Sequence, residues 1–334
     1  MTHELKKIVQ TYIKAQDSGL KAVLATVVAL EGSSYRRPGV RMLIMENGTF
    51  VGAVSGGCVE KEVFRQSESV FKTGIPKIMT YDGRYRLGCE GILYILIEPF
   101  APKNDFLEVF DKIIQERKSF KIASFFNQKD SMDAGYGSVF KFEKEHFNLQ
   151  PNQTNKGFEA FEQKMEPCDK LIIIGAEHDA VQLCSYAALT GWEVTVVVTP
   201  MEEKDIAYFT GAKELIAASP EEYRPIIDEQ TSVVLMTHSY VKDLKYLISL
   251  KETKPFYLGI LGPSRRREKL LNEFLEYCPD ISDVFFDNIH GPAGLDIGAE
   301  TPQEIAISIM SEILSVLREK KPMKLKNKQG TIHS

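Results

Sequence analysis

The segment KLIIIGAEHDAVQLCSYAALTGWEVTVVV, residues 170–198, constrains the fold more than any other part of the chain. It contains an apolar strand, a turn, a helix, a glycine stop and a second apolar strand, which is the pattern of a right-handed βαβ unit. The stretches TSVVLMTH (231–238) and PFYLGILGP (255–263) are two more buried strands, each followed by a helical pattern. We therefore predict a doubly wound, parallel α/β domain of the Rossmann-like type over residues 169–320.

The first half of the chain has a different pattern, which predicts an α+β domain over residues 1–147. Its first hundred residues indicate helix, strand, hairpin, helix, strand and strand, with a type I′ turn at Asn47-Gly48. The polar stretch 148–168 lacks clear periodicity, so we interpret it as a linker between the domains. Residues 321–334 are predicted to form a solvated basic tail.

Composition and charge argue against several classes of protein. The 334 residues carry a formal net charge of −5, without the basic surplus that is typical of nucleic-acid binding. The longest apolar runs have the length of strands, and the start MTHELKKIVQ lacks the apolar core of a signal peptide, so we expect no membrane association. Five widely spread cysteines form no disulfide framework, which favours a cytoplasmic protein.

The dinucleotide-binding fingerprint at the start of the βαβ unit is broken twice. Its three glycine positions hold Gly175, Glu177 and Ala180, and only the alanine is an acceptable replacement. Glu177 places a side chain and a negative charge where pyrophosphate approaches the backbone. The second strand ends in Thr199-Pro200, without the acidic residue that binds ribose hydroxyls. We therefore expect this domain not to bind NAD(P) in the usual way.

A cysteine directly follows a Gly-Gly pair in GAVSGGCVEKEV, residues 52–63. Gly56 and Gly57 allow the backbone to approach another group closely, and the positive end of a helix dipole favours a thiolate at Cys58. The alternative is that Cys58 fills a gap as a small, half-buried residue. Packing is the interpretation for the cysteines in the presumed linker end and helices, Cys168, Cys184 and Cys278.

Several motifs together resemble the xanthine dehydrogenase accessory factor (XdhC/CoxI) family. In the first half these are SSYRRPGVRMLI, GAVSGGCVE and LGCEGILYILIEP. In the second half they are LIIIGAEHDA, VVLMTHSYVKDL, YLGILGPSRRREKLL and HGPAGLDIGAETPQEIAISIMSEIL. The resemblance covers about residues 10–320 except 101–168, and implies an amino-terminal XdhC/CoxI-type domain followed by a Rossmann-like domain.

The resemblance also implies a function. Members of this family help to mature molybdenum hydroxylases such as xanthine dehydrogenase: they hold the molybdenum cofactor transiently, assist its sulfuration and insert it into the apo-enzyme. The implied partners are the apo-molybdenum hydroxylase, a cysteine desulfurase and a second copy of the chain in a homodimer. We expect a cofactor-insertion chaperone with no turnover of its own.

Individual residues match the motifs of the family. Cys58 matches the cysteine of its Gly-Gly-Cys motif, and Cys89 matches a second cysteine, although Glu90 replaces the expected glycine. Gly175 and His178 match its Gly-Ala-Gly-His turn, in which Glu177 replaces glycine. These departures place nucleotide binding in doubt and affect the maturation role less. Cys58 and Cys89 are the candidates for sulfur transfer or a soft contact with the metal.

A molybdenum cofactor carries phosphate, for which the start of a basic helix is a candidate site. Gly262 precedes Ser264, which we predict to be the N-cap, and Arg265 and Arg266 follow as forks for phosphate. The alternative is a solvated basic first turn. The glycine-rich loop 291–300 precedes another helix start at the presumed carboxyl edge of the sheet, and there Gly294, Asp296 and Glu300 are candidate cofactor ligands. This loop could equally serve only to reverse the chain.

Three histidines, His178, His238 and His290, each follow a predicted strand end. Together at one rim they would suit a metal or proton-transfer site, whereas singly each is a hydrogen-bonded loop histidine. We predict no resident metal site. Two other functional classes remain open: an NAD(P)- or flavin-dependent oxidoreductase built on the Rossmann-like domain, and an adaptor without a cofactor. The broken fingerprint argues against the first, and the glycine loops at strand ends argue against the second.

Overall fold

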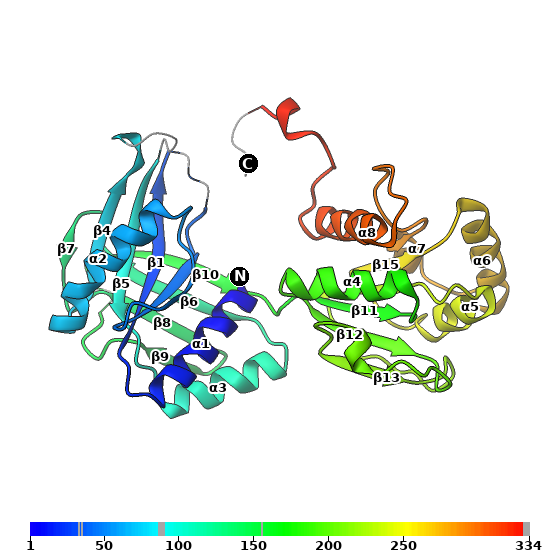
Figure 1. The fold of residues 1–334 in the computed structure, drawn as a ribbon, viewed down its shortest axis with the longest axis horizontal. Coiled ribbons are helices and arrows are strands. Elements are labelled where there is room, and N and C mark those ends of the chain that lie inside the picture. Colours follow the sequence, from blue (N-terminus) through cyan, green and yellow to red (C-terminus); the bar gives the residue numbers. More distant parts are fainter. Residues whose placement is uncertain (33, 35, 86–90, 155, 330–334) are drawn as a thin grey trace. The chain divides into compact units, whose positions relative to one another are not determined.

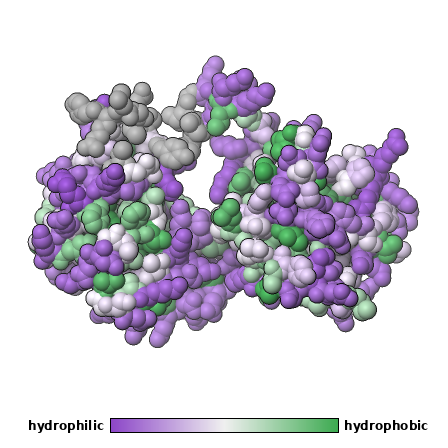
Figure 2. Space-filling model, viewed as in Figure 1, coloured by the Kyte–Doolittle hydropathy of each residue, from purple (hydrophilic) through white to green (hydrophobic). Residues whose placement is uncertain are grey.

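The computed structural model describes residues 1–32, 34, 36–85, 91–154 and 156–329, apart from the side chains of Cys58 and Tyr85. The chain forms two compact units, Met1–Pro167 and Cys168–Ser334 (Figure 1). Within the described residues, no helix combines the length and the apolar character that crossing a membrane requires. Figure 2 shows that hydrophilic residues cover much of the visible surface of each unit, with apolar patches between them.

A six-stranded sheet forms the first layer of the amino-terminal unit. Its strands lie in the order β3-β2-β1-β5-β4-β7, and every neighbouring pair is antiparallel. Valines of α2 pack against the apolar side chains on one face of this sheet. The elements are β1 (Ala22–Glu31), β2 (Arg41–Met45), β3 (Phe50–Gly52), α2 (Cys58–Thr73), β4 (Lys77–Asp82), β5 (Ile92–Pro99) and β7 (Ser131–Met132).

A second, four-stranded antiparallel sheet in the order β10-β6-β8-β9 packs with α1 and α3 around an aromatic core. In α3, Phe106, Phe110 and Ile113 recur at helical spacing and are buried. Phe106 packs edge-on against Phe140 of β8, with ring centroids 5.0 Å apart. The elements are α1 (Thr2–Gln16), α3 (Asn104–Gln115), β6 (Phe120–Phe126), β8 (Gly137–Phe142), β9 (Glu145–Asn148) and β10 (Glu159–Met165).

A buried polar cluster connects the two sheets. The Glu98 carboxylate on β5 is fully buried and accepts hydrogen bonds from the backbone N (3.0 Å) and Oγ (2.6 Å) of Ser138 on β8. Burial raises the pKa of Glu98, and burial lowers the pKa of the Arg41 guanidinium to about 10. Arg41 Nη1 donates to Oε1 of Gln163 on β10 at 2.7 Å. The Glu98–Ser138 hydrogen bonds therefore join β5 to β8, and the Arg41–Gln163 hydrogen bond joins β2 to β10.

The stretch 148–168, which the sequence predicts as a linker, contains a strand instead. β10 pairs with β6 along its whole length, from Glu159 opposite Phe126 to Met165 opposite Phe120. The prediction was wrong because β10 carries mainly polar, exposed side chains and is held by backbone hydrogen bonds to its neighbour. The chain passes between the compact units at Pro167 and Cys168.

The hairpin of β2 and β3 forms as predicted, but its turn is of another type. Gly48 has a φ of 88°, whereas Asn47 has no positive φ. A type I′ turn needs positive φ at both central residues, so the predicted turn type was wrong. Instead, the Asn47 side chain accepts a hydrogen bond from the backbone N of Thr49 at 3.0 Å, which stabilises the turn.

The carboxy-terminal unit is a six-stranded, wholly parallel sheet in the order β13-β12-β11-β14-β15-β16. This order is that of the Rossmann fold, and it reverses between β11 and β14. The fold class predicted from the sequence is confirmed. The elements are β11 (Lys170–Ile174), α4 (His178–Leu189), β12 (Glu193–Val198), β13 (Glu214–Ala217), β14 (Thr231–Leu235), α5 (Tyr240–Ser249), β15 (Tyr257–Ile260), α6 (Ser264–Tyr277), α7 (Asp283–Asp287), β16 (Ile289–His290) and α8 (Pro302–Leu317).

Helices cover both faces of this parallel sheet. Leu171 and Ile173 of β11 belong to the core formed with α4 and α8, which lie side by side (Figure 1). The alternate residues Ile172 and Ile174 belong to the core formed with α5, α6 and α7. β11 is therefore buried on both sides, which explains its uninterrupted apolar sequence.

Candidate functional site

The loops that follow the parallel strands meet at the carboxyl edge of the second sheet, where doubly wound folds bind ligands. The loop after β11 contains Gly175, which has a φ of 149°. A β carbon on Gly175 would collide with the carbonyl oxygen of Met236, in the loop after β14. The fold therefore requires glycine at this position for close packing of two loops, independently of any ligand.

Glu177 and His178 lie at the amino end of α4, and both are exposed. Glu177 is the N-cap, in an extended conformation, and makes no side-chain capping hydrogen bond. Rossmann folds bind pyrophosphate at such a helix start, where a carboxylate would repel it. The position of Glu177 supports the expectation that NAD(P) does not bind, which stays a prediction.

A buried carboxylate, Asp243 of α5, connects the loops after β14 and β15. Its Oδ1 accepts hydrogen bonds from Thr237, 3.2 Å from the backbone N and 2.6 Å from Oγ1. Its Oδ2 accepts one from Arg266 Nη2 at 2.7 Å, and Arg266 Nη1 donates to the carbonyl oxygen of Leu261 at 2.9 Å. Asp243 was not predicted; the only signal was an acidic residue in the quoted motif VVLMTHSYVKDL.

This pairing corrects the predicted phosphate site. Arg266 is committed to a structural contact with Asp243 and is therefore not a free fork for phosphate. Gly262 has a φ of 120°, which favours glycine, and a β carbon there would lie 3.0 Å from Arg266 Nη1, so a side chain would crowd the same contact. The N-cap of α6 is Pro263, and Ser264 is the first residue of the helix, so the predicted capping role of Ser264 was wrong.

Two other arginines remain available at the start of α6. Arg265 is exposed, and its side chain makes no hydrogen bond or ion pair with the described residues. Arg267 is half-buried, and its Nε has no hydrogen-bond partner there. The stem of Arg267 packs against Gly291, where a β carbon would lie 3.0 Å from Cδ. The cationic groups at this helix start that form no ion pair with the described residues are therefore Arg265 and Arg267.

Glu312 of α8 holds the glycine-rich loop after β16. Its Oε2 accepts hydrogen bonds from Tyr257 Oη at 2.5 Å and from the Gly294 backbone N at 2.8 Å. Its Oε1 lies 3.4 Å from His290 Nδ1. Burial raises the pKa of Glu312, but the contacts with His290, Tyr257 and Gly294 outweigh burial and lower it overall. Burial, followed by the charge of Glu312, raises the pKa of Tyr257.

The predicted cofactor ligands in this loop have different environments. Gly294 packs against α8, where a β carbon would collide with Ser308 Oγ. The packing of the loop therefore requires glycine at this position. Asp296 and Glu300 are exposed, and the backbone N of Glu300 donates to Glu304 Oε2 at 2.9 Å. Of the three predicted ligands in this loop, Asp296 and Glu300 are therefore the two whose side chains are open to a ligand.

Of the predicted histidines, His238 and His290 have separate surroundings. His238 Nε2 lies 3.3 Å from Asp179 Oδ2, whereas His290 contacts Glu312 and stacks on Tyr257 with ring centroids 4.4 Å apart. Over the described ranges, no group of three or more His, Cys, Asp or Glu residues is arranged to hold a metal ion. A metal centre built from these histidines is therefore not supported.

In the amino-terminal unit, Cys58 is the first residue of α2, and Gly57 is the N-cap with a φ of 109°. The sequence predicts this helix start, and the backbone agrees. Cys89 lies outside the described residues. The other three cysteines, Cys168, Cys184 and Cys278, are buried and form no disulfide with the described residues, as expected for packing residues, and burial raises the pKa of Cys184 to about 11.

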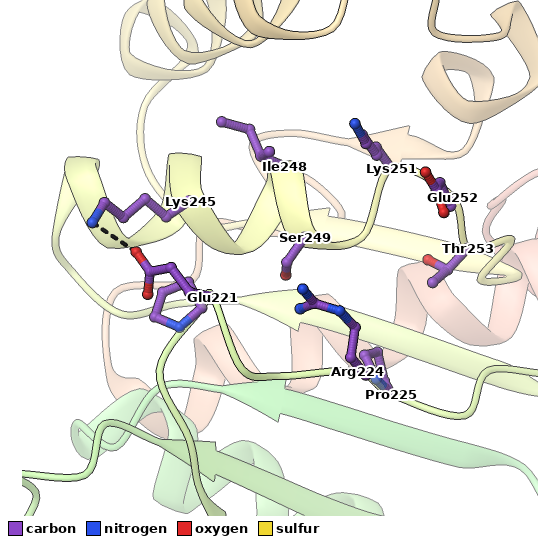
Figure 3. Close-up of a pocket in the computed structure, with 10 residues that line it drawn as sticks. Glu221, Arg224, Pro225, Lys245, Ile248, Ser249, Lys251, Glu252 and Thr253 are labelled. Atoms are coloured by element: carbon purple, nitrogen blue, oxygen red, sulfur yellow. Dashed lines mark hydrogen bonds and ion pairs between the residues drawn. The ribbon is translucent and has the colours of Figure 1, made fainter.

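A surface hollow of about 490 Å³ lies elsewhere on the carboxy-terminal unit, at the end of α5 that leads into β15. Figure 3 shows the Lys245–Glu221 ion pair (2.8 Å) on one side of it and Lys251, Glu252 and Thr253 on the other. No residue predicted as a site residue lines this hollow. Its mixture of charges is typical of an ordinary solvated surface.

Comparison with known proteins assigns the family. The model of the XdhC and CoxI family matches residues 15–82, and the model of the XdhC Rossmann domain matches residues 171–313. The chain belongs to the XdhC and CoxI family. The resemblance found in the motifs is thereby confirmed.

Relatives match this XdhC and CoxI family member over most of its length. A probable xanthine dehydrogenase subunit of Bacillus subtilis (strain 168) is 29% identical over 331 residues, 88% of this chain and 92% of the relative. The molybdenum cofactor insertion chaperone PaoD of Escherichia coli (strain K12) is 26% identical over 323 residues, 95% of this chain and 90% of the relative. A crystal structure described as that of a xanthine dehydrogenase from Bacillus halodurans is 27% identical, with a TM-score of 0.78, and the match covers 94% of this chain and 96% of that one.

The two matched ranges differ in what they include. The XdhC and CoxI range contains Cys58 and the start of α2, and the XdhC Rossmann range contains every loop at the carboxyl edge as well as Glu312. Cys89 and the whole four-stranded sheet fall between the ranges. The family match therefore includes Cys58 but not Cys89, and the roles of both cysteines stay predictions.

Proposed function

We propose that this chain is a maturation factor for a molybdenum hydroxylase of the xanthine dehydrogenase type, which binds molybdenum cofactor and assists its sulfuration and insertion. The observation that carries the proposal is the match to PaoD, a molybdenum cofactor insertion chaperone, over 95% of this chain and 90% of the relative. A match over nearly the whole of both chains supports a shared role of the whole molecule, which a shared fold alone would not.

The side chains of the two units fit different parts of such a cofactor. Cys58 supplies a soft sulfur ligand at a helix start, which suits molybdenum or sulfur transfer. Arg265 and Arg267 supply guanidinium groups for phosphate at the start of α6. The bound cofactor would supply the molybdenum centre that the client enzyme uses, and the residues of this chain would hold it and shield it from water. Each region is proposed as a separate contact.

The proposal includes the partners that such a role needs. The client is an apo-molybdenum hydroxylase, a cysteine desulfurase is the source of sulfur, and a second copy of the chain completes a homodimer. All of these proteins would meet in the cytoplasm. The chain itself would be released after insertion and would catalyse no reaction of its own.

Purification with and without the client tests the proposal. In cells that make the cofactor, we expect the chain to retain a pterin, measured as its fluorescent oxidation product, and to activate the client. Cys58→Ser should abolish activation, whereas Cys278→Ala, which removes a buried thiol elsewhere, should preserve it in folded protein. Absence of pterin, together with equal activation by wild type and Cys58→Ser, would contradict the proposal.

A further inference from the structure

His238 has a strained backbone conformation at the carboxyl edge of the parallel sheet. Its φ is 56°, a left-handed value that residues other than glycine rarely adopt. His238 lies between the end of β14 and the start of α5. The other non-glycine residues with positive φ in the described ranges each follow a helix or lie in a hairpin turn: Arg117, Glu143 and Glu319. Strain at a strand end persists where the surroundings hold the residue in place, and it is concentrated at sites that contact ligands.

Buried groups hold the chain on both sides of His238. Before it, Thr237 donates to Asp243 Oδ1 through its backbone N at 3.2 Å and through Oγ1 at 2.6 Å. After it, the backbone N of Ser239 donates to Thr237 Oγ1 at 3.2 Å. The His238 side chain itself is 48% exposed. The buried Asp243–Arg266 pair therefore keeps an exposed, strained side chain in a fixed position.

The imidazole of His238 faces a carboxylate from the neighbouring loop. Its Nε2 lies 3.3 Å from Oδ2 of Asp179, in the first turn of α4, and the Asp179 side chain is only 14% exposed. A carboxylate beside Nε2 favours the tautomer with the proton on that nitrogen, so Nδ1 keeps a lone pair. Among the described residues, neither His238 Nδ1 nor Asp179 Oδ1 has a hydrogen-bond partner. The pair therefore offers two acceptors to a molecule from outside.

The pair lies where Rossmann-like folds bind their ligands. β11 and β14 are neighbours at the reversal of the strand order, and Asp179 and His238 follow these two strands. Residues 177–181 also contain the exposed carboxylate of Glu177, and they contain no lysine or arginine. Two carboxylates repel an anionic group, whereas carboxylate oxygens and an imidazole lone pair accept hydrogen bonds. A ligand at this position should therefore present N–H donors and no phosphate.

We propose that His238 and Asp179 bind the pterin ring of a molybdenum cofactor through its N–H donors. The 2-amino-4-oxo edge of a pterin has an amino group beside a ring N–H, and both are donors that imidazole and carboxylate acceptors can bind. The proposed phosphate contact of Arg265 lies at the start of α6, after β15, and the Asp243–Arg266 contact connects that loop to the loop of His238. This assignment rests on the proposed function and adds which part of the cofactor each loop binds.

Titration of the full chain with free pterin, followed by the fluorescence polarisation of the pterin, tests this assignment. Lumazine has a carbonyl group in place of the 2-amino group, so it should displace pterin about tenfold less well than unlabelled pterin does, because a hydrogen bond to a charged acceptor is lost. Inorganic phosphate at constant ionic strength should not displace pterin. Equal displacement by lumazine and pterin, or displacement by phosphate, would overturn the proposal. This comparison needs only the wild-type chain.

Substitution of Asp179 tests the carboxylate. Asp179→Asn keeps the shape of the side chain and replaces one acceptor by a donor, so pterin affinity should fall about tenfold. Asp280→Asn, which changes an exposed aspartate of the same unit, is the matched control and should bind pterin as wild type does. Equal affinity of the two variants would contradict a role for Asp179.

Substitution of His238 separates ligand binding from a role in the fold. His238→Gly removes the imidazole and allows the positive φ without strain, so the carboxy-terminal unit should unfold at the wild-type temperature or above it. Its affinity for pterin should nevertheless fall about tenfold, because an acceptor is lost. His146→Ala, an exposed histidine of the other unit, should change neither property. Wild-type pterin affinity in His238→Gly would overturn the proposal.

The failures of this inference and of the proposed function can be distinguished. Loss of client activation in Cys58→Ser, together with equal binding of pterin and lumazine, defeats the role of His238 and Asp179 and leaves the proposed function intact. Full activation by Cys58→Ser without retained pterin defeats the proposed function, whatever the titration with free pterin shows. The titrations are read without cofactor or client.

Discussion

Arg266 Nη2 lies 2.7 Å from Asp243 Oδ2, and the Asp243 side chain has no exposed surface. The two residues belong to neighbouring helices, α6 and α5, and the same carboxylate also holds Thr237 in the loop after β14. A residue that looks like a phosphate ligand in the sequence thus maintains the arrangement of two loops at the carboxyl edge.

Removal of one partner should leave the other buried and unpaired. We expect Arg266→Ala to lower the free energy of unfolding of the carboxy-terminal unit by about 3 kcal/mol, and Asp243→Ala to do so by a similar amount. The single tryptophan, Trp192, is buried in that unit, so its fluorescence during urea unfolding reports on it selectively. Arg265→Ala is the control and should change stability by less than about 0.5 kcal/mol. Equal stability of all the variants would show that the pair contributes nothing.

The cationic groups that remain at the α6 start should determine how strongly phosphate is held. Arg265→Ala and Arg267→Ala together should weaken pterin retention and make the residual binding less sensitive to salt, because charged contacts are screened by ions. The measurement is the amount of pterin that stays with the protein over a series of salt washes. Unchanged pterin retention at every salt concentration would show that the two arginines do not bind the phosphate.

Glu177 should prevent binding of dinucleotides to the carboxy-terminal unit. We expect calorimetric titration of wild type with NAD or NADP to show no measurable heat of binding, because the carboxylate lies where pyrophosphate would contact α4. Glu177→Gly removes the steric and electrostatic obstacle, so any binding should occur in this variant alone. Micromolar affinity in wild type would contradict the expectation and favour an oxidoreductase.

Glu98 should make the stability of the amino-terminal unit depend on pH. Burial raises its pKa above the ordinary value of 4.5 in the folded state. The contribution of Glu98 to the free energy of unfolding is therefore fully present below pH 4.5, and it is lost as the pH rises through the pKa of Glu98 in the folded state. Glu98→Gln cannot ionise, so its unfolding temperature relative to wild type should rise from pH 4 towards neutrality, as measured by calorimetry. If the difference in unfolding temperature between Glu98→Gln and wild type stays constant over this range, folding does not change the pKa of Glu98.

The sequence predicts the parts of the molecule in which local pattern and burial agree. The apolar runs of β11 and β12, separated by a helix and a glycine, predict the parallel sheet because buried strands must be apolar on both faces. Arg266 and Asp243 are 23 residues apart, and nothing in either segment shows that they meet. Ser264 fails as an N-cap because Pro263, with a ψ of 155°, already ends the extended segment.

The same limit applies to the loop before α2. The Gly-Gly-Cys stretch predicts a helix start because glycine, N-cap position and the following charged residues are local signals. The Glu60 side chain accepts hydrogen bonds from the backbone N of Val54, Ser55 and Gly57. The sequence does not show these contacts, because glutamate is equally common as an exposed residue of a helix.

The polar composition of β10 has a protective consequence. β6 is a largely apolar strand, FKIASFF, and without a neighbour it would present free N–H and C=O groups to other chains. β10 occupies that position and ends the sheet with charged side chains such as Glu162 and Lys164. A fragment cut at the apparent linker would lose this cover and expose a strand that is prone to intermolecular pairing, whereas one that ends at Pro167 would keep it.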